Sequence, residues 1–252
     1  GMDVKITLKN GYLAFMHNGA AFSDADVEGI CGIGNGTKAK NSKKIGYKGI
    51  GFKSVFAHSE NVIIKSGGHC FAFDKAYWTS KFRYEMPWQI IPLPANIPFG
   101  QDYDNKYDVC TYIKLKNYET ISKTVLKLFE NSDFLLFLGC KNVCISYYLD
   151  GTLVASLRKL TNDKNVTLYK NNRVDSQWLV HSISPSEATI PENIRELIAK
   201  DENTPEKLKN SWSFDLSFAI SLDQERKMTP IKNSVVYTYL PTSVSMGLPF
   251  LV

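Results

Sequence analysis

The sequence lacks the features that mark secreted, membrane-spanning and low-complexity chains. Its 252 residues contain five cysteines, an odd number at scattered positions, which favours reduced thiols over a disulfide framework. No uninterrupted apolar run exceeds five residues, as at 134–138, whereas a membrane helix needs roughly 20. No charged segment followed by an apolar one opens the chain, so no secretory leader is expected. These absences predict a cytoplasmic protein without a membrane partner.

Acidic residues are missing from one long window. Between residues 29 and 59 there are six lysines and no aspartate or glutamate. The chain as a whole has a net charge of +5, so the residues outside this window sum to −1. A basic excess confined to one segment is typical of a loop that faces phosphate, and a DNA-binding surface is more diffuse. Its 13 tyrosines and 14 phenylalanines follow strand alternation and are expected in the core, so nucleic acid is not an expected partner.

Alternation of apolar and polar residues predicts several strands. A hairpin is expected over residues 3–16, with Asn10-Gly11 as its two-residue turn. A second hairpin is expected over 61–74, and a single strand over 109–115. These strands are the main elements of the predicted sheet.

Helical spacing predicts fewer helices than strands. One helix is expected to begin after Ser23, a favoured N-cap residue, a second from Phe52, and a third over 120–131. Because strands and helices do not alternate regularly, we expect an α+β fold, a two-layer sandwich with helices on one face of a mostly antiparallel sheet. The predicted domains are 1–150 and a C-terminal α+β extension over 151–252.

Three glycine-containing pieces follow one another near the start of the chain. They read HNGAAFS at 17–23, GNGTK at 34–38 and IGYKGIGFKS at 45–54. In the third piece, glycines let backbone N–H groups turn toward an anion because no Cβ blocks the approach. The helix predicted near Gly51 adds its positive dipole end, and Lys48 and Lys53 add full charges. A polyphosphate is the expected ligand.

A second interpretation of these pieces is a glycine-rich surface loop with solvated lysines. Their spacing matches neither the dinucleotide-binding fingerprint nor the P-loop, since the Gly-Lys-Ser/Thr ending is missing.

The three pieces, in this order and spacing, resemble those of the GHKL ATPases, which include gyrase, a heat-shock chaperone, histidine kinases and MutL. They are most similar to the chaperone-like branch with sacsin and the NOV-type proteins. The stretches that carry the resemblance are HNGAAFSDADVEGICGIGNGTK, IGYKGIGFKSVF, CTYIKLK and YTYLPTSVSMGLPF. The resemblance implies the Bergerat fold, that of histidine-kinase-like ATPases, for residues 1–150.

The resemblance also implies a nucleotide, ATP or ADP, and the residues that bind it. Backbone N–H groups of the glycine loop would hold the phosphates, Lys38 and Lys53 would offset their charge, and Thr111 would lie near the adenine. The implied nucleotide-binding residues are His17, Asn18, Gly19, Phe22, Gly36, Thr37, Lys38, Gly46, Lys48, Gly49, Ile50, Gly51, Phe52, Lys53 and Thr111.

The sequence departs from the family at the residue that reads the base. His17 stands where the family has an aspartate that accepts a hydrogen bond from the adenine amino group. A neutral imidazole accepts through one nitrogen only. Alternatively, His17 only caps the strand end, and the amide oxygen of Asn18 could accept in its place.

A second departure concerns hydrolysis. The family carries, in a helix before the first hairpin, a glutamate that activates water and an asparagine that binds Mg²⁺; neither is found here, so no metal ligand is assigned. Hydrolysis needs a positioned base and a cation at the phosphates, and we expect it to be negligible in this chain. The expected role is nucleotide binding within a chaperone-like ATPase, with protein clients or further domains of a longer chain as partners. The alternative is a degenerate, non-catalytic protein-interaction module with the same fold.

Overall fold

A computed structural model describes residues 1–32, 51–99, 106–184, 189–204, 209–210, 216–238 and 240–252. The chain forms two compact units. Unit 1 comprises Gly1–Asn131 and Val143–Arg158, and unit 2 comprises Ser132–Asn142 and Lys159–Val252. The domain boundary expected at residue 150 stays a prediction.

The sheet of unit 1 follows the strand order β7-β1-β2-β6-β3-β4-β5. β1 runs parallel to β7, and the other registers described in this unit are antiparallel. The predicted first hairpin is confirmed, with Asn10 and Gly11 at φ of 51° and 79° in the turn between β1 and β2. The strands are β1 Met2–Lys9, β2 Tyr12–His17, β3 Ser59–Ser66, β4 His69–Asp74, β5 Leu93–Pro94, β6 Val109–Leu115 and β7 Val143–Leu149.

The helices of unit 1 are short, and each follows a local signal. The first begins at the predicted N-cap, because Ser23 and Asp26 form a capping box in which each side chain accepts from the other's backbone N–H. The helix expected from Phe52 is a 3₁₀ helix and not an α-helix, and Ser54 Oγ donates to Gly51 O within its first turn. The helices are α1 Asp24–Cys31, η2 Phe52–Ala57, α2 Lys75–Lys81, η3 Trp88–Ile90 and α3 Tyr118–Leu128.

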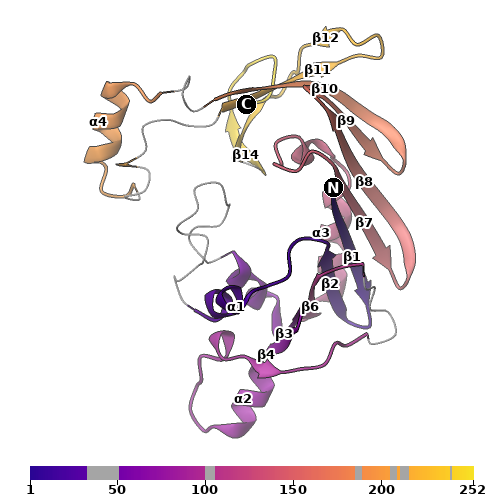
Figure 1. Ribbon diagram of the computed structural model, residues 1–252, viewed down its shortest axis with the longest axis vertical. Coiled ribbons are helices and arrows are strands. Elements are labelled where there is room, and N and C mark those ends of the chain that lie inside the picture. Colours follow the sequence, from indigo (N-terminus) through magenta and orange to yellow (C-terminus); the bar gives the residue numbers. More distant parts are fainter. Residues whose placement is uncertain (33–50, 100–105, 185–188, 205–208, 211–215, 239) are drawn as a thin grey trace. The chain divides into compact units, whose positions relative to one another are not determined.

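The two faces of this sheet bury different apolar clusters. On one face Ile64, Phe71 and Phe73 pack with Trp88 and with side chains of α1, η2 and α2, which lie beside β3 and β4 in Figure 1. On the other face Ala14, Met16, Ile63, Ala72, Cys110 and Tyr112 pack against Phe99 and Tyr107. Helices on one face of a mostly antiparallel sheet confirm the predicted α+β class. Among the described helices, none is long and apolar enough to cross a lipid bilayer.

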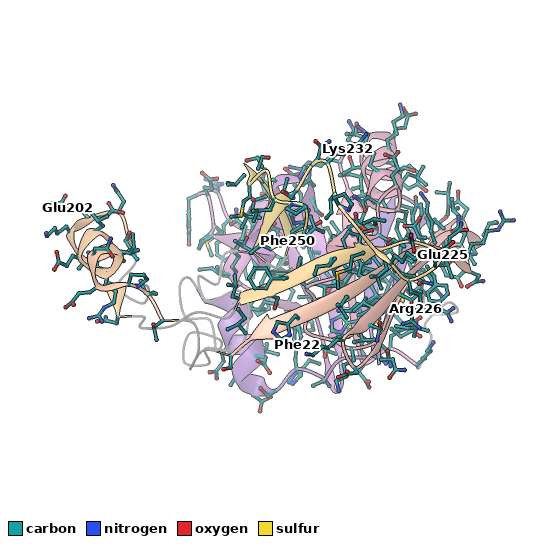
Figure 2. The ribbon with its side chains drawn as sticks, turned by 90° about the horizontal axis from the view of Figure 1, so that it is seen from above. Phe22, Glu202, Glu225, Arg226, Lys232 and Phe250 are labelled. Carbon is teal, nitrogen blue, oxygen red and sulfur yellow. The ribbon has the colours of Figure 1, made fainter. Side chains whose placement is uncertain are left out.

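Unit 2 is an antiparallel meander that continues from β8, followed by a separate hairpin. Phe250, labelled in Figure 2, makes an edge-to-face contact with Phe218 of β11, at 5.6 Å between ring centroids. Arg226, in the turn before β12, donates to Asn165 Oδ1 at 2.9 Å. β8 Thr152–Asn162 begins in unit 1 and enters unit 2 at Lys159. The other elements of unit 2 are η4 Asp133–Leu135, β9 Asn165–Lys170, β10 Arg173–Ile183, α4 Glu192–Lys200, β11 Leu216–Leu222, β12 Met228–Thr229, β13 Val235–Thr238 and β14 Leu240–Ser245.

Candidate functional site

The register between β2 and β6 brings two predicted site residues to one face of the unit 1 sheet. His17 pairs with Val109, and Phe15 pairs with Thr111. Because alternate residues of a strand share a face and paired residues lie side by side, His17, Phe15 and Thr111 point to the same side. Thr111 also pairs with Ile64 of β3, so this is the face that α1 and η2 cover.

Phe15, His17 and Thr111 are each at least partly exposed on this face. The Phe15 ring is 40% exposed and lies 5.9 Å from the His17 ring between centroids, at an interplanar angle of 60°. Thr111 is half-buried beside it. This face therefore combines an aromatic surface, a hydroxyl and an imidazole.

Phe15 is a candidate site residue that the sequence alone did not single out. Aromatic side chains were expected in the core, and for Phe15 this expectation is wrong. A signal was present, since strict alternation in the strand ending at His17 places Phe15 on the same face as the imidazole.

His17 is held by the backbone that follows it. The N–H of Gly19 donates to Nδ1 of His17 at 3.1 Å. Burial lowers the pKa of the His17 imidazole, and the negative charge of Asp108 opposes this shift. A neutral imidazole that accepts at Nδ1 carries its proton on Nε2, so this nitrogen is a donor. The His17 imidazole in this form therefore presents a hydrogen-bond donor at Nε2.

Gly19 is required for this arrangement. A Cβ built on Gly19 would lie 2.8 Å from Nδ1 and 3.1 Å from Cε1 of His17. Any other residue would push the ring away from the backbone donor. The first glycine of the motif thus has a steric function beyond chain flexibility.

Asn18 forms hydrogen bonds with the main chain at the start of β1. Its Oδ1 accepts from the N–H of Asp3 at 2.7 Å, and its Nδ2 donates to Gly1 O at 3.2 Å. Its backbone N–H donates to Asp3 O at 3.2 Å. In this conformation the amide fastens β1 to the end of β2.

Phe22 fastens the segment after β2 to the sheet. Its N–H donates to Ser66 Oγ at 2.8 Å, and Ser66 is fully buried at the end of β3. The ring packs against the cluster of Ile64, Phe71 and Phe73. Figure 2 labels this side chain.

Lys53 points into the fold. Its Nζ donates to Ile30 O at 2.6 Å and to Gln89 O at 2.9 Å, and it lies 5.4 Å and 5.9 Å from the ring centroids of Phe73 and Phe56. Burial lowers the pKa of this ammonium, with Cys31 opposing the shift. Phe52, the residue before Lys53, packs against the apolar cluster of Ile64, Phe71 and Phe73. A Cβ on Gly51 would meet no atom within 4 Å. The phosphate role expected of Lys53 stays a prediction, and in this conformation its ammonium holds α1 and η3 together.

The remaining predicted residues lie outside the described residues. These are Gly36, Thr37, Lys38, Gly46, Lys48, Gly49 and Ile50. Within the described ranges, no group of three or more histidine, cysteine, aspartate or glutamate side chains is arranged to hold a metal ion.

Comparison with known proteins identifies the class of this chain. Residues 6–133, about half of the chain and almost all within unit 1, match the family model described as the sacsin domain. The chain belongs to the sacsin-domain family. It is also similar to Protein NO VEIN of Arabidopsis thaliana, with 39% identity over 184 residues that cover 68% of this chain and 7% of that protein. The predicted resemblance to sacsin and NOV-type proteins is confirmed.

Proposed function

We propose that unit 1 binds a nucleotide, ATP or ADP, with its base on the sheet face formed by Phe15, His17 and Thr111. The observation that carries this proposal is the register of β2 and β6, which brings a half-buried imidazole, a hydroxyl and an exposed ring together at the entry to α1. Membership of the sacsin-domain family and the resemblance of its glycine motifs to GHKL ATPases support it.

The described residues fit a base better than they fit the phosphates. The Phe15 ring supplies a face for stacking, Thr111 a hydroxyl, and His17 a donor at Nε2. Phosphate binding would rest on the glycine and lysine residues between 33 and 50 and on the backbone near Gly51. Mg²⁺ is expected for the family, but the described residues include no cluster of three or more histidine, cysteine, aspartate or glutamate side chains that could hold it.

The alternative is a sacsin-type fold that has lost its nucleotide and serves protein interaction. A specific observation favours this alternative. Asn18 and Lys53, two of the residues implied to bind nucleotide, use their side-chain polar groups in hydrogen bonds to the main chain of unit 1. In either case the whole protein is proposed to be a larger chaperone-like assembly with client proteins, since this chain covers 7% of its plant relative.

Calorimetric titration with ADP, with and without Mg²⁺, tests the proposal. We expect saturable binding that Thr111→Val weakens roughly fivefold, the loss of about one hydrogen bond. Thr167→Val is the matched control, because Thr167 is a half-buried strand threonine of unit 2. If a folded chain gives no heat of binding at millimolar ADP, nucleotide binding is contradicted. The protein-interaction module then remains as the proposed function.

A further inference from the structure

Unit 2 contains a nearly buried cation for which the described residues provide no carboxylate partner. Lys159, in β8, is only 4% exposed. Its Nζ donates to Leu136 O at 2.9 Å and to Leu138 O at 2.7 Å. Among the described residues, no aspartate or glutamate forms an ion pair with it. Buried charges in proteins are normally paired, because desolvating an isolated charge is costly.

The two carbonyl groups satisfy only part of what this ammonium offers. An ammonium has three N–H donors, and the carbonyls take two of them. Carbonyl dipoles also carry no net charge with which to balance the cation. Accordingly, burial lowers the pKa of Lys159, with Cys140 opposing the shift. Within the described part of unit 2, one N–H donor of Lys159 and its positive charge therefore remain without a partner.

Lys159 lines a cavity of about 460 Å³ whose walls come from unit 2 alone. This volume lies within the range of about 300–1,000 Å³ that is usual for small-molecule sites. Lys141 and Lys164 also line the cavity, whereas Asp163 is the one acidic residue among its lining residues. The wall is therefore cationic, which suits an anion.

Hydroxyl groups complete the polar lining. Thr161 Oγ1 is buried without a hydrogen-bond partner in the described part of the chain. The hydroxyls of Ser182 and Ser217 lie 2.8 Å apart on the same wall. Such groups can donate to the oxygen atoms of an anion that Lys159 holds.

We propose that this cavity binds an oxyanion, a phosphate or carboxylate group of a small molecule, with Lys159 as its principal ligand. The carbonyls of Leu136 and Leu138 orient the ammonium, and the third N–H donates to the anion. The anion supplies the negative charge that the described residues do not. This site is independent of the nucleotide proposed for unit 1.

A purely structural lysine makes a different prediction. If Lys159 only fastens the segment after η4 to β8, its environment is already complete, and the chain is indifferent to anions beyond general salt effects. Anion dependence that is saturable and specific to Lys159 therefore separates the two.

The test is a titration of the full chain with sodium phosphate and, separately, with succinate, each against chloride at the same ionic strength and pH. Nuclear magnetic resonance follows the Lys159 side chain and the amides of Cys140 and Thr161. We expect a saturable shift at these groups with millimolar or tighter affinity. A response to phosphate alone or to succinate alone supports the site and identifies the anion class.

Two variants and one labelling experiment keep the test decisive. Lys159→Met should abolish the saturable shift, and Lys232→Met, an exposed lysine of unit 2 outside the cavity and labelled in Figure 2, should leave it unchanged. If Lys159→Met fails to fold, amine acylation of the parent chain replaces it, and the bound anion should slow the labelling of Lys159 several-fold but not that of Lys232. No saturable shift in the parent chain, the same shift in Lys159→Met, or equal labelling with and without anion would overturn the proposal.

Discussion

Each unit of the molecule contains a lysine that uses its ammonium group to hold main-chain carbonyls. Lys53 in unit 1 joins Ile30 and Gln89, and Lys159 in unit 2 joins Leu136 and Leu138. The two lysines differ in what covers the rest of the charge. Phe73 and Phe56 present their rings to Lys53, whereas Lys159 borders a cavity. The ammonium of Lys53 is half-buried against aromatic rings, whereas the more deeply buried ammonium of Lys159 borders a cavity that a ligand could enter.

The largest effect is expected when the lysine of unit 2 is replaced. Lys159→Met leaves a buried carbonyl, Leu136 O, and a partly buried one, Leu138 O, without this donor, and hydrogen bonds from charged groups are each worth about 1.5–3 kcal/mol. We expect the free energy of unfolding to fall by about 3 kcal/mol in urea denaturation. An unchanged unfolding midpoint would show that the carbonyls find other partners.

Replacement of the lysine of unit 1 should cost less. Lys53→Met keeps a chain that packs on Phe56 and Phe73, and Lys53 is only half-buried, so water can reach the freed carbonyls. We expect a loss of about 2 kcal/mol by the same measurement. A larger loss than for Lys159→Met would reverse the comparison between the two lysines.

His17 makes the opposite kind of hydrogen bond to that of the two lysines. The backbone N–H of Gly19 donates and the His17 imidazole accepts, whereas Lys53 and Lys159 donate to backbone carbonyls. Gly19→Ala would place a Cβ 2.8 Å from Nδ1 and displace the ring, with the loss of about 1 kcal/mol for one hydrogen bond. The imidazole nitrogen chemical shifts should then lose the pattern of an Nε2-protonated ring. Gly68→Ala, where a Cβ meets no atom within 4 Å, is the control, and a pattern equally altered there would contradict the steric argument.

The smallest effect is a pH dependence whose direction follows from the pKa shifts of the two lysines. Burial lowers the pKa of Lys53 and Lys159 in the folded state, so between the folded pKa and the ordinary lysine pKa of 10.5 the unfolded chain binds more protons. Stability contributed by each lysine therefore rises with pH through this alkaline window. The gap in unfolding free energy between the parent chain and each Met variant should widen as the pH rises toward 10.5, and a narrowing gap would contradict the assigned shifts.

Much of unit 1 could be predicted because its signals are local. The turn at Asn10-Gly11, the cap at Ser23 and the alternation in β6 each depend on neighbouring residues, and each is confirmed. The length and type of η2 could not be predicted, because apolar spacing alone does not distinguish a short 3₁₀ helix from an α-helix.

The partners of polar side chains were beyond the reach of the sequence. Lys53 follows a glycine motif that suggests phosphate, yet its acceptors are the carbonyls of Ile30 and Gln89, distant in sequence. Lys159 occupies the inward position of an alternating strand after Ala155 and Leu157, a readable anomaly, but nothing local identifies the carbonyls that it meets. Tertiary contacts, not periodicity, decide what such groups bind.

The parallel pairing of β1 with β7 has a consequence for how unit 1 is made. β1 is translated more than a hundred residues before β7, its parallel partner on one side. Until then Met2–Lys9 is an edge strand with unpaired backbone groups and the apolar side chains of Val4, Ile6 and Leu8, a surface that invites association between chains. The sacsin-domain match ends at residue 133, before β7 begins. A fragment cut to the limits of that match would keep the open edge permanently, so an expressed fragment of unit 1 has to extend through β7.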